Sequence, residues 1–316
     1  MIKELTVNTN EQRDAPFDYW PILNRPKLKL PNGENIAVWI GMNVEYFPID
    51  RPGMSINPRM AEYVPDPANY GWRSYGMRVG IWRFLDAVDK YDLPVSVLLN
   101  SDVCYHYPEL IREGNKRNWA WLAHGKNNTI LEVKMELEEE RKYLTDVVSV
   151  IQKSTGKKPK GWLGPSLSET FNTPRLLADL GLSYLCDWCN DDEPYPLNIP
   201  NRKMISVPYS IEINDAEIYY RKGLDGQGFY QTIKDQFDTL YEEGATSAKI
   251  MAICIHPFLT SLPFRHKYFC KVMEYIKGHD KVWLTTSDEI ADWYFKNYYD
   301  EAVKSMAERK RALGLT

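Results

Sequence analysis

Short apolar runs alternate with segments of helical period along most of this 316-residue chain, and this alternation limits what it can fold into. The runs are rich in β-branched residues, which is typical of strands buried on both faces. Strands that alternate with helices form parallel sheets, and this many units favours a barrel over an open sheet. The predicted strands are Ile36–Met42, Val95–Leu99, Trp119–Ala123, Gly161–Leu163, Ser183–Cys186, Ile205–Val207, Ile250–Ile255 and Val282–Leu284.

Helical periodicity and proline spacing divide the rest of the chain. Residues 1–33 carry four evenly spaced prolines and are predicted to form an extended arm that wraps the body or a neighbouring subunit. Residues 34–297 would form the catalytic barrel, and residues 298–316 a charged C-terminal helix that is either solvated or docked on a partner. The predicted helices of the barrel are Val79–Tyr91, Tyr107–Lys116, Glu132–Ser154, Pro174–Leu180, Gly228–Glu243, Arg265–Lys277 and Thr286–Phe295.

Two proline-rich stretches interrupt this rhythm. Pro48–Arg78 and Asn190–Arg202 are too long for ordinary connections, and both contain aromatic residues. Loops of this length in a compact domain are commonly functional, so we expect them to border a binding site.

Composition excludes several classes of partner. The 39 basic and 43 acidic residues give a net charge of −4, so no overall positive field attracts nucleic acid or an anionic membrane. No apolar run reaches the roughly 18 residues of a membrane span, and Met1–Asp14 lacks the apolar stretch of a secretory signal. The five cysteines are spread along the chain and do not form a disulfide framework. We therefore expect a cytoplasmic protein with a small-molecule substrate.

Titratable side chains follow several predicted strands directly. Glu45, His124, Asp187 and His256 each come at or just after the end of such a strand. Each alone has a structural explanation, such as a loop ion pair or a turn cap. Because parallel strands of a barrel end at one mouth, however, their shared position favours an active site. Pro257 biases His256 towards extended backbone, which suits a histidine preset for general acid or base catalysis.

The motifs around these residues resemble the polysaccharide deacetylase superfamily, whose catalytic unit is the NodB homology domain. The similarity is closest to its branch of metal-independent allantoinases and related cyclic-amide hydrolases, and runs from about Trp20 to Tyr294. It implies a distorted (β/α) barrel of about seven strands and a homo-oligomer, a dimer or tetramer. The matching stretches include Asn43–Glu45, Tyr75–Arg78, Gly80–Arg83, His124–Gly125, Gly161–Trp162, Asp187, Asp191–Tyr195, Val207–Tyr209, Asn214–Asp215, Asp235–Thr246, Ile255–His256 and His279–Trp283.

Departures from the family pattern concern the metal. Metal-dependent members have an aspartate base and an aspartate ligand where this chain has Asn43 and Glu45. They have two histidine ligands where it has His124 and Asn128. Zinc prefers several strong N, S or O⁻ donors, and an amide is a poor substitute. We therefore expect no tightly bound cofactor. If zinc binds, its ligands would be Glu45, His124 and Asn128, and Asp187 could add a carboxylate.

These observations predict hydrolysis of a non-peptide C–N bond in a small cyclic amide, imide or ureide. Glu45 would activate water, with its pKa raised by burial, and His256 would protonate the leaving nitrogen, although these two roles could be reversed. His124 would share the water or polarise the carbonyl, and Asp187 completes the catalytic set. The predicted substrate-binding residues are Asn43, Asn128 and Asn214, which would read amide edges, and Trp162, Tyr209 and Arg73 or Arg78, which would form walls.

Two other functions remain open from the sequence. The first is a metal-dependent deacetylase of an N-acetylated sugar, which would require stoichiometric metal. The second is a non-catalytic protein that binds a small ligand on a deacetylase scaffold.

Overall fold

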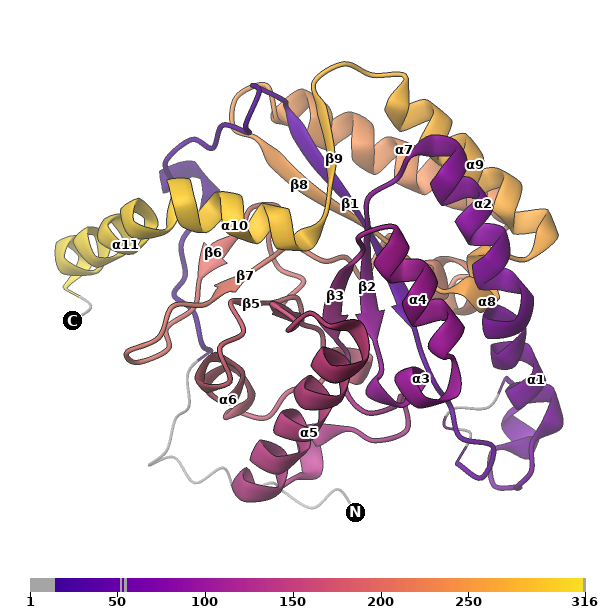
Figure 1. The fold of residues 1–316 in the computed structure, drawn as a ribbon. Coiled ribbons are helices and arrows are strands. Elements are labelled where there is room, and N and C mark those ends of the chain that lie inside the picture. Colours follow the sequence, from indigo (N-terminus) through magenta and orange to yellow (C-terminus); the bar gives the residue numbers. More distant parts are fainter. Residues whose placement is uncertain (1–14, 52, 54–55, 315–316) are drawn as a thin grey trace, which may run out of the picture.

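A single curled sheet forms the centre of the molecule, and helices wrap its outer face (Figure 1). The computed structural model describes residues 15–51, 53 and 56–314. The strand order is β6-β7-β5-β4-β3-β2-β1-β8, with β9 beside β1, and only the β6–β7 pair is antiparallel in the described sheet. The strands are β1 Ile36–Val44, β2 Val95–Leu99, β3 Ala120–Ala123, β4 Gly161–Trp162, β5 Tyr184–Leu185, β6 Tyr195–Pro196, β7 Ile205–Ser206, β8 Lys249–Ile255 and β9 Val282–Thr285.

The distorted barrel confirms the fold predicted from the alternating pattern. All eight predicted strands are found, and β6 is an additional short strand inside the predicted Asn190–Arg202 loop. Between β7 and β8 the described residues form no ladder. An isolated bridge from Asn214 to Cys254 and a backbone hydrogen bond from Ile250 to Asp192 span this gap instead.

The predicted helices are all present, and several begin at recognisable caps. Thr286 and Glu289 form a capping box at α10, as the sequence indicated. Sequence reading missed α1 within Pro48–Arg78, where Asp66 caps the helix; residues 52, 54 and 55 of that segment lie outside the described part. The α-helices are α1 Pro67–Tyr75, α2 Ile81–Tyr91, α3 Ser101–His106, α4 Pro108–Lys116, α5 Leu137–Thr155, α6 Thr173–Asp179, α7 Gly226–Glu243, α8 Pro257–Thr260, α9 Pro263–Lys277, α10 Ser287–Asn297 and α11 Tyr299–Leu313.

Alternation along the buried strands decides which side chains face the barrel interior. In β1, the even-numbered residues pack with the helices on the outer face, whereas Ala37 and Trp39 pack in the interior. Successive strand residues point to opposite faces, so this parity directs Asn43 and Glu45 inward as well. The same parity in β8, with Ala252 and Cys254 in the interior, directs His256 inward.

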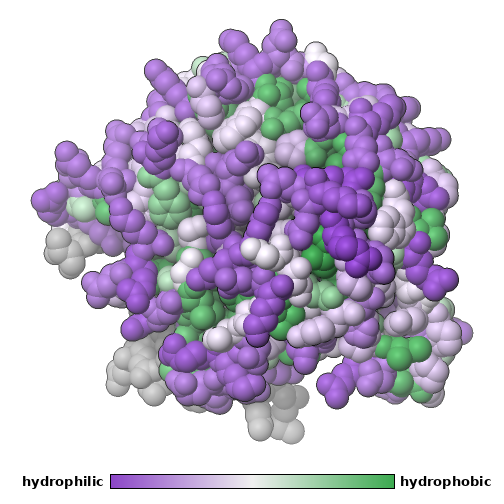
Figure 2. All heavy atoms as spheres, viewed as in Figure 1, coloured by the Kyte–Doolittle hydropathy of each residue, from purple (hydrophilic) through white to green (hydrophobic). Residues whose placement is uncertain are grey.

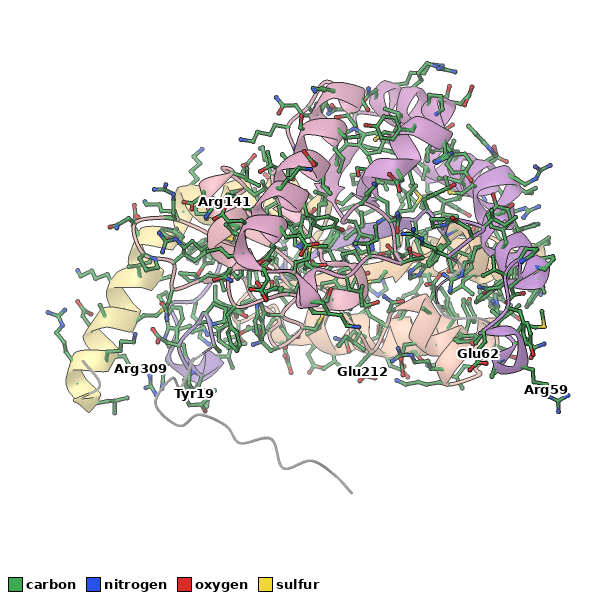
Figure 3. All side chains as sticks on the ribbon, turned by 90° about the horizontal axis from the view of Figure 1, so that it is seen from below. Tyr19, Arg59, Glu62, Arg141, Glu212 and Arg309 are labelled. Carbon is green, nitrogen blue, oxygen red and sulfur yellow. The ribbon has the colours of Figure 1, made fainter. Side chains whose placement is uncertain are left out.

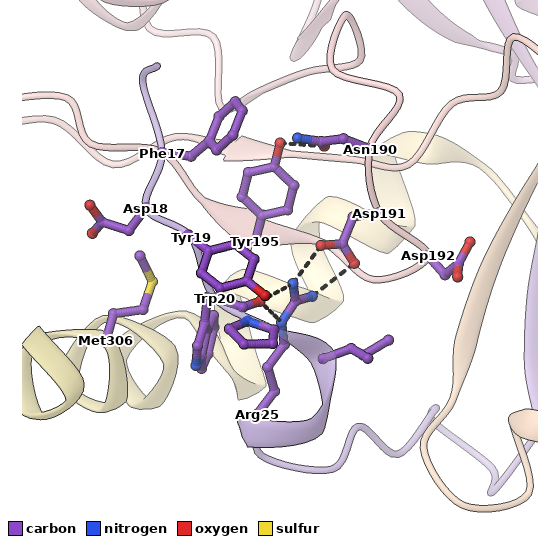
Figure 4. Close-up of a pocket in the computed structure, with 12 residues that line it drawn as sticks. Phe17, Asp18, Tyr19, Trp20, Arg25, Asn190, Asp191, Asp192, Tyr195 and Met306 are labelled. Carbon is purple, nitrogen blue, oxygen red and sulfur yellow. Dashed lines mark hydrogen bonds and ion pairs between the residues drawn. The ribbon is translucent and has the colours of Figure 1, made fainter. Parts of the chain in front are cut away.

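The N-terminal arm packs against its own chain. Arg25 makes a two-pronged ion pair with Asp191, at 2.8 and 2.6 Å, and also donates to the carbonyl of Trp20 (Figure 4). Leu28 is buried beside the start of β8, where its backbone bonds Ser247 and Ala248. Residues 1–14 of the predicted arm, including the segment that argues against a secretory signal, lie outside the described residues.

The C-terminal helix α11 also contacts the body. Ala302 and Met306 are buried, and Lys310 pairs with Asp18 of the arm at 2.7 Å. The apolar positions of α11 that could dock on a partner subunit are thus buried within the chain itself. The predicted oligomer stays a prediction. Tyr19 and Arg309 lie at the end of the molecule opposite Arg59 and Glu62 (Figure 3).

The surface agrees with the balanced composition. Polar residues cover most of the face in Figure 2, and apolar residues occur there in small separate groups. Among the helices of the described residues, none is long and apolar enough to cross a membrane.

Two glycines allow a close approach that positions the site. Residues Gly76–Gly80 form a π-helical turn between α1 and α2 that packs on α8, directly after His256. A Cβ on Gly80 would lie 2.3 Å from the carbonyl oxygen of Pro257, and one on Gly76 would lie 2.7 Å from the amide nitrogen of Phe258. Because these neighbours are backbone atoms, larger residues would displace the segment that carries His256.

We predict that Gly80→Ala lowers the free energy of unfolding by about 1–3 kcal/mol, since the added methyl overpacks a backbone contact. Gly71→Ala in α1 is the matched control, because nothing lies within 4 Å of its added Cβ. This control should raise stability by about 0.5–1 kcal/mol through helix propensity. Denaturant unfolding of both variants measures the difference, and equal effects would contradict the close approach.

Candidate active site

Inward-facing residues at the carboxyl ends of the strands border a cavity of about 510 Å³. This volume suits a small organic molecule. Strand β1 contributes Asn43, and the loops after β1, β3 and β8 contribute Glu45, His124 and His256. The cavity also has an apolar side, formed mainly by loop residues and by α1. Of the residues predicted from sequence, those that line it are Asn43, Glu45, Arg73, His124, Asn128, Tyr209, Asn214 and His256.

The carboxylate of Glu45 lies between the two histidines. Its Oε1 atom is 3.5 Å from Nε2 of His124 and 3.4 Å from Nε2 of His256. All three side chains are almost fully buried. Residues 45, 124 and 256 are far apart in sequence, and the parallel sheet brings them together as predicted.

A chain of amide hydrogen bonds fixes the carboxylate of Glu45. The Asn100 Oδ1 atom accepts from the backbone N–H of Tyr46 at 2.8 Å, which settles the orientation of the Asn100 amide. Its Nδ2 then donates to Oδ1 of Asn128 at 2.9 Å. Asn128 in turn donates its own Nδ2 hydrogen to Glu45. Asn128 thus presents a hydrogen-bond donor, and not a lone pair, to the carboxylate.

Asp215 orients His256 from behind. Its Oδ1 atom is 2.6 Å from Nδ1 of His256, and its Oδ2 atom accepts from the His256 backbone N–H at 2.7 Å. The hydroxyl of Thr260 donates to the same Oδ2 at 2.6 Å. Asp215 is fully buried, so the imidazole is fixed with Nδ1 towards the carboxylate and Nε2 towards the cavity.

These contacts shift the pKa values of His256 and Glu45 in opposite directions. Burial opposes the charged form of His256, but the carboxylates of Glu45 and Asp215 outweigh it and raise its pKa to about 10. Burial also disfavours the Glu45 carboxylate, but the charge of His256 and hydrogen bonds from both histidines hold its pKa well below the ordinary range. The prediction that burial raises the pKa of Glu45 is therefore wrong, because two neighbouring imidazoles outweigh desolvation.

His124 has a defined tautomer. Its Nδ1 atom lies 2.7 Å from the carbonyl oxygen of Leu163, and a carbonyl only accepts, so Nδ1 carries the proton. Its Nε2 atom faces both the Glu45 carboxylate, at 3.5 Å, and the cavity. A proton on Nε2 is therefore directed at the carboxylate or at a water molecule next to it.

The other polar lining residues are held by one another. Nδ2 of Asn43 donates to the Tyr209 hydroxyl at 3.1 Å and to the carbonyl of Ile255 at 3.2 Å. Asn214 donates to the same hydroxyl at 3.3 Å. The Oδ1 atom of Asn43 keeps accepting capacity, so these side chains form a rigid polar floor with few free groups.

Three predicted site residues lie elsewhere, and the strand parity explains two of them. Trp162 packs fully buried on the helix side of β4, while its neighbour Leu163 faces inward. Asp187 follows the inward Cys186, does not line the cavity, and accepts from the backbone N–H of Gly164 at 2.6 Å. Burial, and then the nearby carboxylate of Glu169, raise the pKa of Asp187 well above its ordinary value. Arg78 is exposed on the π-helical turn, and Arg73 is the arginine that lines the cavity.

Sequence reasoning missed two residues of the network. Asp215 was visible as an acidic residue after a strand, within the Asn214–Asp215 motif, but its bond to His256 depends on the crossover between β7 and β8. Asn100 had a detectable signal, since it directly follows a buried strand as His124 does. It carries no charge, however, and so did not stand out.

The donor set does not fit a tightly bound zinc ion. The described residues contain no group of three or more His, Cys, Asp or Glu side chains arranged to hold a metal. Asn128 also directs its amide hydrogen towards Glu45, and its oxygen is used by Asn100. Glu45 and His124 alone provide fewer strong donors than zinc requires.

Comparison with known proteins places this geometry in a family. The model of the polysaccharide deacetylase family matches residues 73–185. A Schizosaccharomyces pombe protein classed as a polysaccharide deacetylase is 30% identical over 245 residues, covering 71% of this chain and 76% of that protein. The peptidoglycan deacetylase of Helicobacter pylori is 25% identical over 265 residues, covering 73% of this chain and 88% of the relative.

Solved structures give the same assignment. The crystal structure of Puue allantoinase superposes with a TM-score of 0.78 at 26% identity, covering 89% of this chain and 99% of that one. A Pseudomonas aeruginosa protein described as a polysaccharide deacetylase superposes with a TM-score of 0.77, also at 26% identity, over 87% and 95% of the two chains.

The fold and these relatives define a hydrolase of carbon–nitrogen bonds other than peptide bonds. The chain belongs to the polysaccharide deacetylase family, which confirms the resemblance inferred from its motifs.

We predict that Asp215→Asn lowers the pKa of His256 from about 10 towards its ordinary value of 6.5, since one of the two stabilising carboxylates is removed. NMR titration of the histidine ring measures this change. Asp235→Asn, on an exposed position of α7, is the control and should leave the titration unchanged.

The same substitution should alter the pH dependence of stability. The raised pKa of His256 adds stability that is complete below pH 6.5 and is lost as pH rises through about 10. In Asp215→Asn this stability should therefore be lost at lower pH than in the wild type. At pH 8 the variant should have a lower unfolding midpoint than the wild-type protein. Identical midpoints and titrations in the variant and the wild type would contradict the assigned pairing.

Proposed function

We propose that this protein hydrolyses a ring C–N bond of a small cyclic amide, imide or ureide without a tightly bound metal. One observation carries the proposal: the carboxylate of Glu45 and the imidazole of His256 face each other across 3.4 Å at the cavity floor. A lowered pKa of Glu45 and a raised pKa of His256 favour the charged forms of both groups. Such a pair supplies both the base and the acid that amide hydrolysis needs. The likeness to Puue allantoinase agrees with this substrate class.

In the proposed reaction, Glu45 accepts a proton from water as its oxygen attacks the ring carbonyl carbon. His124 positions this water through Nε2, opposite the Leu163 contact of its Nδ1. The C–N bond then breaks and His256 transfers its Nε2 proton to the leaving nitrogen. Afterwards Glu45 is protonated and His256 neutral, and proton transfer between these neighbouring groups restores the starting state.

The pKa shifts of Glu45 and His256 favour the starting protonation states that this direction of proton flow needs. Glu45 is a weak base while His256 is charged, because that charge lowers the pKa of Glu45. When His256 gives up its proton at C–N cleavage, this lowering charge is lost and the pKa of Glu45 rises, so Glu45 holds the proton taken from water until it is returned to His256. Asp215 acts on His256 alone and keeps its Nε2 directed at the substrate.

We assign to Arg73 the stabilisation of the negative oxygen of the intermediate. It lines the cavity, and burial lowers the pKa of its guanidinium while Glu45 raises it. A preorganised cation near a developing oxyanion is among the strongest contributors to catalysis of acyl transfer. Asn43 and Tyr209 form the rigid floor against which the ring would rest.

We expect chelator-treated protein to open at least one ring in a panel of allantoin, hydantoins, succinimides and dihydropyrimidines. Glu45→Gln should lower kcat on that substrate by at least about 10², the usual contribution of a general base. Glu242→Gln, an exposed glutamate of α7, serves as the control and should turn over at the wild-type rate. Measured ring opening by chromatography decides the outcome. If only an N-acetylated sugar were hydrolysed, and only after metal was added, the metal-dependent alternative would replace this proposal.

We also predict that Asn128→His binds zinc at least about tenfold more tightly than the wild-type protein, since an imidazole donor would replace an amide next to Glu45 and His124. Isothermal calorimetry with zinc alone measures the affinity. Asn32→His places a histidine on the exposed surface and should show no such gain. Tight stoichiometric zinc in the wild-type protein would overturn the metal-free proposal.

A further inference from the structure

A row of aromatic rings leads from the floor of the cavity to its mouth. It begins with Phe258, whose ring centroid lies 5.5 Å from that of His256. Trp72 packs edge-on against Phe258 at 4.8 Å, and Tyr220 follows at 5.6 Å from Trp72. Exposure increases along the row, from 8% at Phe258 to 39% at Tyr220. The row therefore connects the proposed acid with the solvent.

The cavity lining carries further apolar groups. Leu131 and Ile211 line it and are 37% and 45% exposed. Large apolar side chains that remain exposed beside a catalytic floor lose nothing by being covered by an apolar ligand group.

The charged groups of the cavity are balanced among themselves. Glu45 and Asp215 flank His256, and Glu217 pairs with Arg221 at 3.5 Å near the mouth. The guanidinium of Arg73 lies over the ring of Phe47 at 3.5 Å and within 6 Å of Trp72 and Phe258. The charges described here thus belong to the catalytic groups, to the Glu217–Arg221 pair and to Arg73, which the proposed reaction assigns to the oxyanion.

We propose that the aromatic row formed by Phe258, Trp72 and Tyr220 is a subsite for an uncharged apolar substituent, preferably aromatic, on the ring that is hydrolysed. This inference rests on the proposed function and names the substrate class more closely. The substituent lies on the side of the leaving nitrogen, because the row starts beside His256. Aromatic rings favour offset or edge-to-face contacts with such a group, and its burial adds binding energy.

The test compares 3-phenylhydantoin with unsubstituted hydantoin, and N-phenylsuccinimide with succinimide, because these rings carry the phenyl group on the leaving nitrogen. We expect kcat/KM to be roughly tenfold or more higher for each phenyl-substituted ring. Tyr220→Ala should lower kcat/KM for the phenyl rings by about tenfold and should affect the bare rings less. Trp82→Ala is the matched control: it removes an aromatic side chain of similar exposure, 38%, from α2 outside the cavity.

Calorimetry with the Glu45→Gln variant separates this proposal from the proposed function. Tighter binding of the phenyl rings, lost on adding Tyr220→Ala, supports the subsite even if no ring is turned over, and the absence of turnover would then count against the function alone. Equal kcat/KM and equal affinity for phenyl and bare rings would overturn the subsite while ring hydrolysis stands. Failure of every ring to bind would overturn both.

Discussion

A buried carboxylate is costly unless positive charge or hydrogen-bond donors surround it, and the site is organised around this requirement at Glu45. The two histidines and the Asn128 amide each contribute to it from a different part of the chain. Each of these partners is itself held by a further bond, from Leu163, Asp215 or Asn100. The result is a network in which the protonation of one group depends on all the others.

The network also shows how the Glu45 carboxylate is compensated at a position where metal-dependent relatives have a further histidine. In place of a second imidazole donor, Asn128 offers a hydrogen to the carboxylate and its oxygen is already engaged. Removing a strong donor would ordinarily leave Glu45 uncompensated. Here the protonated state of His256, supported by Asp215, supplies the positive charge. The same scaffold can therefore accommodate a buried carboxylate by proton chemistry.

Much of the fold could be predicted, because it depends on local patterns. The strands Ile36–Val44 and Lys249–Ile255 are long, buried on both faces and β-branched, so their position and parallel arrangement followed from the sequence. The helix α1 and the strand β6 were missed. The first lies in a proline-rich stretch without clear apolar period, and the second is a two-residue antiparallel strand held by tertiary pairing.

The sequence by itself determined the barrel, the shared mouth, and the meeting of Glu45, His124 and His256, since parallel strands must end on one side. It did not determine which side chains in and after the short strands point into the cavity. Asp187 and Trp162 were therefore predicted to line the cavity, and they do not. Nor could it give the charge of Glu45, because that depends on distances of a few ångströms to groups about 80 and 210 positions away. Pattern and period act along the chain, whereas burial and electrostatic coupling arise only after distant segments have packed.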